Sequence, residues 1–577
     1  MLDHLIAGVT VVDGTGAPAY VADVGIRDGR IAGIGTRITE EARTTEDASG
    51  LVLAPGFVDP HTHYDAQLFW DPYATPSLNH GVTTVAAGNC GFTLAPLNPD
   101  RPEDADYTRR MMSKVEGMSL VALEEGAPWT WSGFGEYLDA LEGRIAVNAG
   151  FMVGHCALRR YVMGPDAVGG QPTEQQLADM LRLLHEAMDA GAWGFSTTQS
   201  SSHSDGDGEP VASRHALPAE LLALSQAVGE HEGTQIEAIV AGCLDQFSDA
   251  EIDLFVEMSA AAGRPLNWNV LTIDSSVPAR VPRQLEASER ARKAGGRVVA
   301  LTMPILTPMN MSLGTFCALN LIPGWGPVLG LPVAERIARL ADPEVRAELV
   351  RRGQSEEAGV FRRLTDFGRY VIGDTYSAAN EGLTGRVVED IAAERGLDPF
   401  SCLVEICVAD ELRTVLWPMP TDNDPASWAL RAETWRHEDV LLGGSDAGAH
   451  LDRMCGAPYT TRFLGDCLRG RKLVSLERAV QMLTDEPARL FGLRERGRVQ
   501  EGFHADLVLF DPERIAADKA TLVHDLPGDS PRLDSKAIGV TAVWVNGVET
   551  IRNDTVTGAV PGRVLRSGRD TATVSTK

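Results

Sequence analysis

Short alternating runs of apolar and polar residues mark both ends of the chain. Residues 1–54 hold several β-branched runs separated by turn dipeptides that contain glycine, a pattern that predicts a small antiparallel sheet. Near the other end, 505–510 is strand-like and 542–548 resembles a hairpin around Asn546-Gly547. Because chain termini often lie close together, we expect 1–54 and 496–577 to build one small β domain.

The middle of the chain alternates apolar strand-like runs with longer amphipathic segments such as 174–190 and 218–231. This alternation is typical of βα units. Eight strands are predicted, at 51–58, 82–88, 146–154, 191–197, 234–240, 265–271, 297–303 and 440–446. Eight such units predict an α/β fold of the (β/α)8 TIM-like barrel class over 55–495, with the active site at the C-terminal ends of the strands.

The segment between the seventh and eighth predicted strands is far too long for one βα connection. Three stretches in it, 332–354, 384–396 and 401–413, have helical patterns. We therefore expect a helical insertion or lid within the barrel, over about 305–437.

Composition narrows the function classes. The 577 residues, 44% hydrophobic and 23% charged, are those of an ordinary globular protein, and 52 basic against 80 acidic residues give a net charge of −28. This charge argues against nucleic acid or an anionic membrane surface as a partner. The start lacks a secretion signal, no apolar run approaches membrane-spanning length, and the eight cysteines form no CxxC pair. These features favour a reduced, cytoplasmic protein that acts on a small molecule. Assembly into a homo-oligomer remains compatible with the sequence.

Candidate chemistry begins at His61 and His63, which follow the first predicted strand of the barrel. Side chains one residue apart on a strand point to the same side, so the two imidazoles can converge on one metal ion. Imidazole suits zinc and its first-row neighbours. The alternative is that one histidine caps the strand while the other is solvated.

Further polar residues stand where the other predicted strands end. They are Asn89, Cys90, His155, Glu237, Asn267, Asn269, Ser445 and Asp446. Strand ends of a (β/α)8 barrel meet around one site, so this register points to an active site rather than to scattered surface residues.

These residues also carry a resemblance. The chain resembles the amidohydrolase superfamily, and within it the N-acyl-D-amino-acid deacylase (D-aminoacylase-like) branch, over nearly its whole length. The matching motifs run from Gly56 to Gln67, from Gly81 to Gly91, from Val153 to His155, from Gly194 to Thr197, from Gly444 to Ala447 and from Glu486 to Leu493. The resemblance implies a (β/α)8 metallohydrolase barrel beside a β-sandwich built from both termini.

The resemblance implies that His61 and His63 bind one metal and that Asp446 touches the metal and shuttles the proton. It makes Cys90 a metal ligand where many relatives use a carboxylated lysine. No lysine lies near the end of the fourth predicted strand, and a thiolate is a plausible substitute because metal binding lowers a cysteine pKa. The alternative for Cys90 is a small buried hydrophobe.

The chain departs from the branch pattern at two strands. That pattern expects metal-binding histidines after strands 5 and 6, where this sequence has Glu237 and the pair Asn267 and Asn269. Either Glu237 supplies an oxygen ligand, which zinc accepts, or a second metal site has lost its ligands. We expect one Zn2+ ion, or another divalent metal, with a second left open, and we expect the two asparagines to bind substrate.

Other residues have candidate roles. His155 is expected to orient substrate or to stabilise an oxyanion, the alternative being a structural histidine. Arg453, with Arg159 and Arg160, is a candidate for gripping a substrate carboxylate, because arginine offers a bidentate fork. His450, four residues after Asp446, is expected to face the barrel mouth.

The leading hypothesis is metal-dependent hydrolysis of a C–N amide bond in an N-acyl amino acid, with Asp446 as general base and acid. Within enzymes, the alternative is hydrolysis of a cyclic amide, a carbamate or a natural-product amide. A different class is a non-catalytic binding protein on a degenerate barrel, which the missing histidines motivate.

Overall fold

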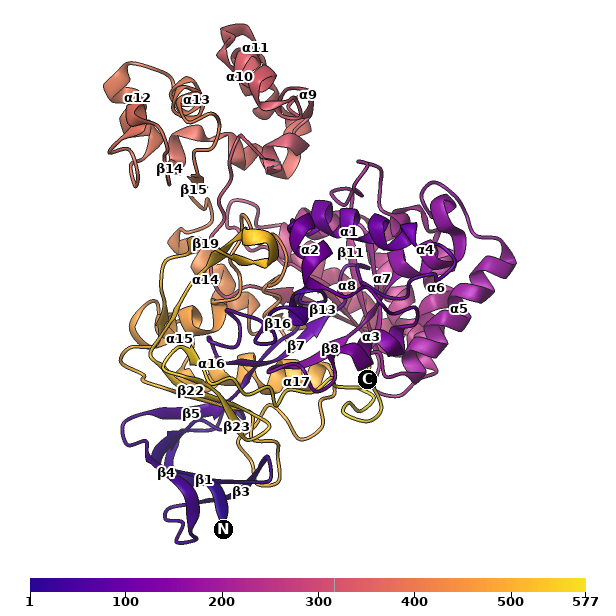
Figure 1. The fold of residues 1–577 in the computed structure, drawn as a ribbon, viewed down its shortest axis with the longest axis vertical. Helices are drawn as coiled ribbons and strands as arrows, with labels where there is room; N and C mark the ends of the chain where they lie inside the picture. Colours follow the sequence, from indigo (N-terminus) through magenta and orange to yellow (C-terminus); the bar gives the residue numbers. More distant parts are fainter. Residues whose placement is uncertain (316, 577) are drawn as a thin grey trace. The chain divides into compact units, whose positions relative to one another are not determined.

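The computed structural model describes residues 1–315 and 317–576, and a series of short parallel strands runs through its central part (Figure 1). The members are β6 (Phe57–Asp59), β7 (Val82–Ala87), β8 (Asn148–Phe151), β9 (Val153–Gly154), β10 (Gly194–Gln199), β11 (Gln235–Val240), β12 (Pro265–Asn269), β13 (Arg297–Thr302) and β16 (Val440–Leu442). One ladder joins β6, β7 and β8, and a second joins β9 through β13 to β16 in chain order. A parallel bridge between Thr62 and Ala447 links the segments that follow the first and last of these strands.

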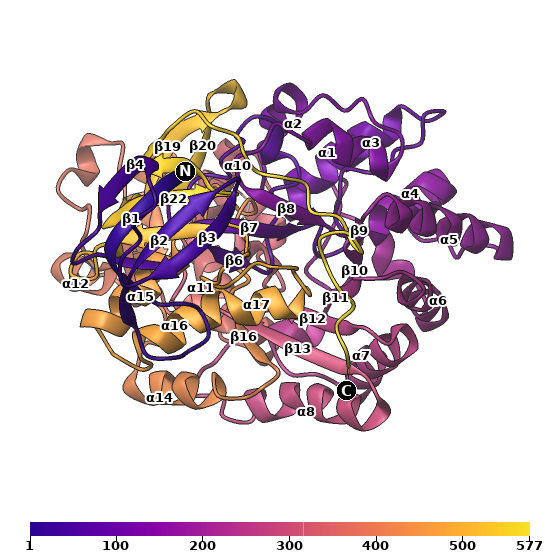
Figure 2. The ribbon, with the colours of Figure 1, turned by 90° about the horizontal axis from the view of Figure 1, so that it is seen from below.

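Helices follow the strands, as parallel neighbours require. They include α4 (His155–Met163), α5 (Glu174–Asp189), α6 (Pro218–Gly229), α7 (Asp249–Ala262), α8 (Arg280–Ala294), α15 (Tyr459–Arg469), α16 (Leu476–Leu483) and α17 (Asp485–Leu490). Figure 2 shows α5 to α8 on the outside of β10 to β13. A capping box starts α5: Gln176 donates its backbone N–H to the Thr173 hydroxyl at 3.2 Å, and its side chain accepts from Thr173 N at 2.8 Å.

The region after β7 is longer and adds three helices before β8. These are α1 (Glu103–Val115), α2 (Leu120–Gly126) and α3 (Phe134–Leu141). Their apolar sides join the main core, to which α3 contributes Phe134 and Tyr137. Glu116 is the C-cap of α1.

The prediction of one continuous strand over 51–58 is wrong, because the structure has two strands there. It divides at Gly56 into β5 (Val52–Pro55), which pairs with strands of the terminal sheet, and β6, which pairs with β7. A Cβ on Gly56 would lie 2.1 Å from Thr83 Oγ1, so only glycine lets the chain cross this close to β7. The apolar run is continuous in sequence because both halves are buried.

Strands from both ends of the chain join in one nine-stranded sheet, whose indigo and yellow strands lie side by side in Figure 1. The N-terminal members are β1 (Leu2–Val11), β2 (Tyr20–Arg27), β3 (Arg30–Gly35), β4 (Ala42–Asp47) and β5, and the C-terminal members are β17 (Leu507–Phe510), β22 (Val540–Val545), β23 (Val548–Arg552) and β24 (Thr555–Val556). The predicted hairpin is confirmed: β22 turns into β23 at Asn546-Gly547, with φ of 48° and 76°, as a type I′ turn requires.

The chain divides into two compact units, Met1–Thr307 with Trp428–Lys577, and Pro308–Ser427. The second unit contains α9 (Gly326–Leu329), α10 (Val333–Ala341), α11 (Pro343–Gly353), α12 (Val388–Arg395), α13 (Pro399–Ala409) and the short pair β14 (Tyr370–Ile372) and β15 (Leu416–Pro418). The predicted helical stretch 332–354 is two helices, because Asp342 caps α11 and Pro343 begins it. The boundaries predicted for the domains stay predictions. Among the described residues, every helix is too short or too polar to cross a membrane.

Candidate functional site

Three residues from the ends of β6 and β7 converge. His61, His63 and Cys90 are buried, and their ligand atoms all lie within 4.8 Å of one another. The Cys90 thiol is 3.5 Å from His61 Nε2 and 3.9 Å from His63 Nε2. The two imidazoles of the predicted pair therefore face one point, together with the predicted thiol.

Backbone conformation carries Cys90 to this point. Cys90 has φ of 56°, the left-handed region that few residues other than glycine adopt, and it lies between Gly88 and Gly91, which also have positive φ. A Cβ on Gly88 would meet Met152 O at 2.2 Å. The Ser196 hydroxyl holds the turn, since it donates to Gly88 O and accepts from Gly91 N. The strained turn directs the thiol toward the histidines instead of into the core.

Asp446 reaches the same point from the end of β16. Asp446 N donates to His61 O at 3.1 Å, and His63 N donates to Ala447 O at 2.7 Å, so two strands far apart in sequence are held in register. With φ of 60°, Asp446 places Oδ1 at 3.1 Å from His63 Nε2 and 3.6 Å from His61 Nε2. These backbone hydrogen bonds fix the carboxylate beside both imidazoles.

Asp59, which was not predicted as a site residue, holds the residue before Asp446 in place. Its carboxylate accepts hydrogen bonds from the Ser445 hydroxyl and from Ser445 N, the latter at 3.3 Å. The side chain is fully buried, and burial raises the pKa of Asp59 to about 6. Asp59 therefore ties the residue before Asp446 to the strand that carries His61.

Two further carboxylates surround the cluster. Glu237 Oε2 accepts from Cys90 N at 2.7 Å, and its Oε1 is 3.9 Å from His61 Nδ1. Glu116, which no sequence pattern indicated, places Oε1 at 3.5 Å from His63 Nδ1. Glu237 lies beside the three-residue group rather than within it, and its Oε1 has no hydrogen-bond partner among the described residues.

The electrostatics of the cluster favour a cation. Burial, with the charges of Glu237 and Glu116, raises the pKa of the Cys90 thiol well above its usual value, and burial raises the pKa of Glu237 to about 8. Burial alone would raise the pKa of Asp446, but His63, His450 and His61 lower it below its usual value. Acidic groups thus crowd a buried site, and a divalent cation would relieve their mutual repulsion.

The distances from the two imidazoles to the thiol and to the carboxylate are close to those between ligands of one metal ion. Bonds of 2.0–2.3 Å to nitrogen, oxygen and sulfur place neighbouring ligand atoms roughly 3.3–3.6 Å apart. The distances from the two Nε2 atoms of His61 and His63 to the Cys90 thiol are 3.5 and 3.9 Å, and those to Asp446 Oδ1 are 3.6 and 3.1 Å. The donor set and its spacing are those of a divalent metal site.

His155 is placed away from this cluster. Its ring is fully buried, with Nδ1 at 2.9 Å from the Thr197 hydroxyl and Nε2 at 2.9 Å from Glu220 Oε1. Both ring nitrogens are engaged by protein side chains, which favours the structural alternative over oxyanion stabilisation. Arg159 grips the same Glu220 in a buried bidentate pair, and Arg160 binds Asp104, so neither arginine is free to hold a substrate carboxylate.

Of the remaining predicted residues, one bonds to the neighbouring strand and the others lie near the residues that follow β16. Asn267 is fully buried and donates to Gln235 Oε1 and Ile236 O, both at 3.3 Å. Asn269 is part-buried, and its Nδ2 is 3.5 Å from the carbonyl oxygen of Gly444, two residues before Asp446. His450 Nε2 is 3.6 Å from Asp446 Oδ2, and the partly exposed Arg453 contacts Asp452 at 2.8 Å. Asn269 and His450 thus lie near the cluster, whereas Asn267 belongs to the strand wall.

His203 is a further residue that the sequence did not single out as a site residue. Its Nδ1 is 2.8 Å from the Thr198 hydroxyl, and its ring packs edge-on against Phe92 at 5.2 Å between centroids. Burial lowers the pKa of His203 to about 3; the charges of His450 and His63 lower it further, whereas the charge of Asp446 raises it. A neutral imidazole therefore lies among the groups around Asp446.

Comparison with known proteins agrees with this site. The profile described as "Amidohydrolase family" matches residues 44–551. D-aminoacylase of Alcaligenes xylosoxydans xylosoxydans is 31% identical over 585 residues, which cover 98% of this chain and 97% of that protein. N-acyl-D-aspartate deacylase of the same organism is 30% identical, over 98% of this chain and 95% of that protein.

Solved structures show the same likeness. A D-aminoacylase structure whose subject is a binuclear metal centre has a TM-score of 0.65 and 28% identity, and it covers 98% of this chain and 100% of its own. N-acyl-D-glutamate deacylase from Bordetella bronchiseptica, complexed with zinc and a phosphonate inhibitor, has a TM-score of 0.65 and 27% identity, with the same coverage.

These likenesses confirm the predicted resemblance, and they confirm at a coarse level a TIM-barrel metallohydrolase with an additional domain. They also support a divalent metal as the cofactor, in agreement with the cluster of His61, His63 and Cys90. The chain belongs to the amidohydrolase family and is a metal-dependent hydrolase of carbon–nitrogen amide bonds.

Proposed function

We propose that this protein is a zinc-dependent deacylase of N-acyl-D-amino acids. One observation carries the proposal: the ligand atoms of His61, His63 and Cys90 lie within 4.8 Å of one another, and Asp446 Oδ1 lies 3.1 Å and 3.6 Å from the Nε2 atoms of His63 and His61. The names of the relatives, D-aminoacylase and N-acyl-D-aspartate deacylase, supply the substrate class. The amide of a small acylated amino acid is the bond that breaks.

In this proposal His61 and His63 bind the ion through Nε2, with Cys90 as thiolate and Asp446 through Oδ1. Glu237 is proposed as an oxygen ligand at the edge of the site, because its Oε1 is buried without a hydrogen-bond partner among the described residues. Bound zinc supplies Lewis-acid chemistry, lowering the pKa of water toward ~7 and polarising the amide carbonyl. The contact between His63 Nδ1 and Glu116 holds the His63 ring in its orientation.

Asp446 moves the proton. An aspartate is ionised near pH 7, so the Asp446 carboxylate would accept a proton from the attacking water. As the carbon–nitrogen bond breaks, the same group would return that proton to the nitrogen of the leaving amine. A general acid–base group of this kind accounts for about 10²–10⁴-fold in rate.

Specificity is proposed to come from residues around Asp446. His450 contacts Asp446 and Asn269 contacts Gly444, while Arg453, three residues beyond His450, offers a fork for the substrate carboxylate. Asn267 and His155 are proposed to support the wall, since their polar atoms bond to neighbouring strands and to Glu220.

We also propose that the functional parts follow the predicted boundaries. The terminal β domain then comprises 1–54 with 496–577, the barrel 55–495, and the helical insertion 305–437. Each proposed ligand comes from the barrel segment, and the chain passes from β5 of the terminal sheet to β6 of the barrel at Gly56.

The test combines metal analysis with turnover. Purified enzyme is expected to hold about one zinc per chain, and to hydrolyse N-acetyl-D-amino acids faster than the L-enantiomers or cyclic ureides. Asp446→Asn should lower kcat/KM by at least ~10²-fold, whereas Asp100→Asn, an exposed carboxylate, should not. Full turnover by folded Asp446→Asn protein, or by enzyme freed of metal, would show the assignment to be wrong.

A further inference from the structure

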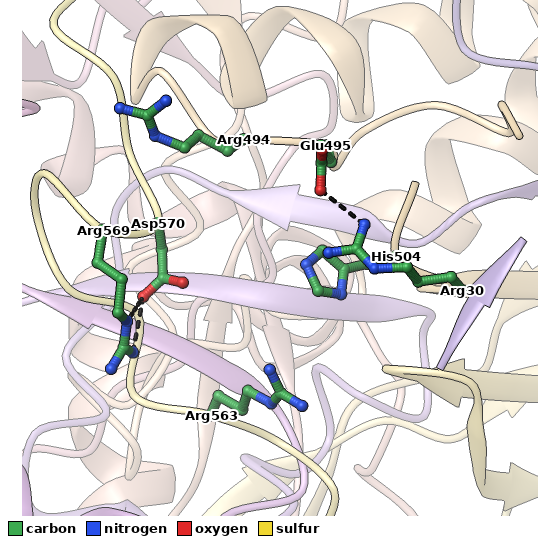
Figure 3. Close-up of a pocket in the computed structure, with 7 residues that line it drawn as sticks. All are labelled: Arg30, Arg494, Glu495, His504, Arg563, Arg569 and Asp570. Carbon is green, nitrogen blue, oxygen red and sulfur yellow. Dashed lines mark hydrogen bonds and ion pairs between the residues drawn. The ribbon is translucent and has the colours of Figure 1, made fainter. Parts of the chain in front are cut away.

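A second polar site lies far from the strand ends that carry the metal cluster. Seven residues line an open hollow of about 500 Å3: Arg30, Arg494, Glu495, His504, Arg563, Arg569 and Asp570. Figure 3 shows their side chains around an open centre, with Arg30 and His504 on one side and Arg569 and Asp570 on the other. Ligand pockets typically have volumes of about 300–1,000 Å3, so the basic hollow has room for a small molecule.

The lining carries an excess of positive charge. Glu495 pairs with Arg30 at 2.6 Å, and Asp570 pairs with Arg569 at 2.7 Å. Arg494 and Arg563 form no ion pair within 4 Å with a carboxylate of the described residues; Arg494 donates to the backbone oxygens of Thr571 and Gly568. Four guanidiniums against two carboxylates leave a charge of +2, in a chain whose net charge is −28.

Ordered backbone holds these groups in place. Arg563 O accepts from Ala149 N at 3.0 Å at the start of β8, and Arg494 N donates to Asp570 O at 2.9 Å. An antiparallel backbone β-bridge joins Arg30 to His504, and the Arg30 guanidinium donates to Gly502 O. Three segments that are distant in sequence, β3, the segment after α17 and the C-terminal tail, therefore present their arginines toward one space.

Like charges gathered in this way repel one another unless an anion separates them. A phosphate group carries about −1.5 to −2 charges at pH 7 and three strong acceptor oxygens, which matches the two arginines that lack carboxylates. Arginine binds phosphate through paired N–H donors. No Phe, Tyr or Trp lines the hollow. The lining therefore binds the charged group of a ligand and offers no Phe, Tyr or Trp ring on which a nucleobase could stack.

We propose that the basic hollow binds a phosphate or diphosphate group and thereby joins the C-terminal tail to the terminal sheet. Arg563 and Arg494 donate their hydrogen bonds to the anion alone. Arg30 and Arg569 also contact the anion, while they keep their ion pairs with Glu495 and Asp570. The site is independent of the metal centre and of the deacylase reaction.

The test is calorimetric titration of the zinc-loaded enzyme with pyrophosphate and inorganic phosphate at constant ionic strength. Saturable binding is expected, accompanied by a rise in melting temperature. Arg563→Ala should weaken it by at least ~10-fold, because one bidentate contact is lost, whereas Arg37→Ala, an exposed arginine outside the hollow, should leave it unchanged. Without anion, Arg563→Ala should melt no lower than the parent, since it removes repulsion.

The substitution Glu495→Gln should change the affinity for pyrophosphate in the opposite direction. It releases Arg30 from its ion pair, so pyrophosphate should bind more tightly than to the parent. A sugar phosphate titrated in parallel distinguishes an organic phosphate from a free one, and either as the tighter ligand supports the site. No saturable binding up to ~10 mM, or binding that is equal in Arg563→Ala and Arg37→Ala, would overturn the proposal, because the anion would then bind nowhere or elsewhere, such as at the metal.

Discussion

Replacement of Glu116 by glutamine tests whether a carboxylate outside the ligand set controls the metal site. Glu116 ends α1, is 3% exposed, and holds Oε1 at 3.5 Å from His63 Nδ1. Glutamine keeps the shape and the backbone hydrogen bond from His450 N to the carbonyl of residue 116. The substitution therefore removes mainly the charge that orients His63.

The magnitude follows from the distance. Two full charges 3.5 Å apart would interact by about 5 kcal/mol at an effective dielectric constant of 20. A metal-bound histidine is neutral, so the effect is smaller, and partners of this kind typically contribute 10–100-fold in metal affinity. We expect Glu116→Gln to bind zinc about 10–100-fold more weakly, with kcat at saturating zinc falling less than about tenfold.

The assay is competition for zinc against a chromophoric chelator, followed by kinetics at saturating metal. Glu124→Gln on α2 is the matched control, because Glu124 is exposed and lies on a neighbouring helix of the same region. Zinc affinities of Glu116→Gln and Glu124→Gln that agree within about twofold would refute the reasoning, since the contact to His63 would then have no role in metal binding.

Two predictions concern stability. Gly56→Ala should destabilise the fold by about 1–3 kcal/mol or more, because its Cβ would lie 2.1 Å from Thr83 Oγ1, whereas Gly35→Ala meets nothing within 4 Å; urea unfolding of the two variants measures the difference, and equal midpoints would contradict the crossing at Gly56. His80 is fully buried between Thr461 Oγ1 and Ser535 O, and burial lowers its pKa to about 4. Protonation thus favours the unfolded chain: the stability from neutral His80 is complete above pH ~6.5 and is lost as pH falls through about 4, by roughly 3 kcal/mol. Unfolding at pH 7 and pH 4.5 should show a smaller pH dependence in His80→Gln, while the exposed His524→Gln should follow the parent.

The sequence determined what depends on local pattern. Periodicity predicted the strand-like runs and helices such as α5 and α6 to within a few residues, because burial of one face repeats along each element. Motifs at strand ends identified His61, His63, Cys90 and Asp446, since strand polarity places successive ends at one site. A continuous apolar run concealed the division at Gly56, because β5 and β6 are both buried and periodicity registers burial but not the sheet that provides it.

Only the tertiary structure decided the contacts between segments that are remote in sequence. Glu116 meets His63 from the end of a helix that follows another strand, and Asp59 binds Ser445 across 386 positions. His155, predicted from its strand end, turned out to have both ring nitrogens bound by Thr197 and Glu220. The arginines of the basic hollow come from three separate stretches. A side chain's chemical role depends on which groups desolvate and face it, and the packing of distant segments sets those neighbours, which no local pattern encodes.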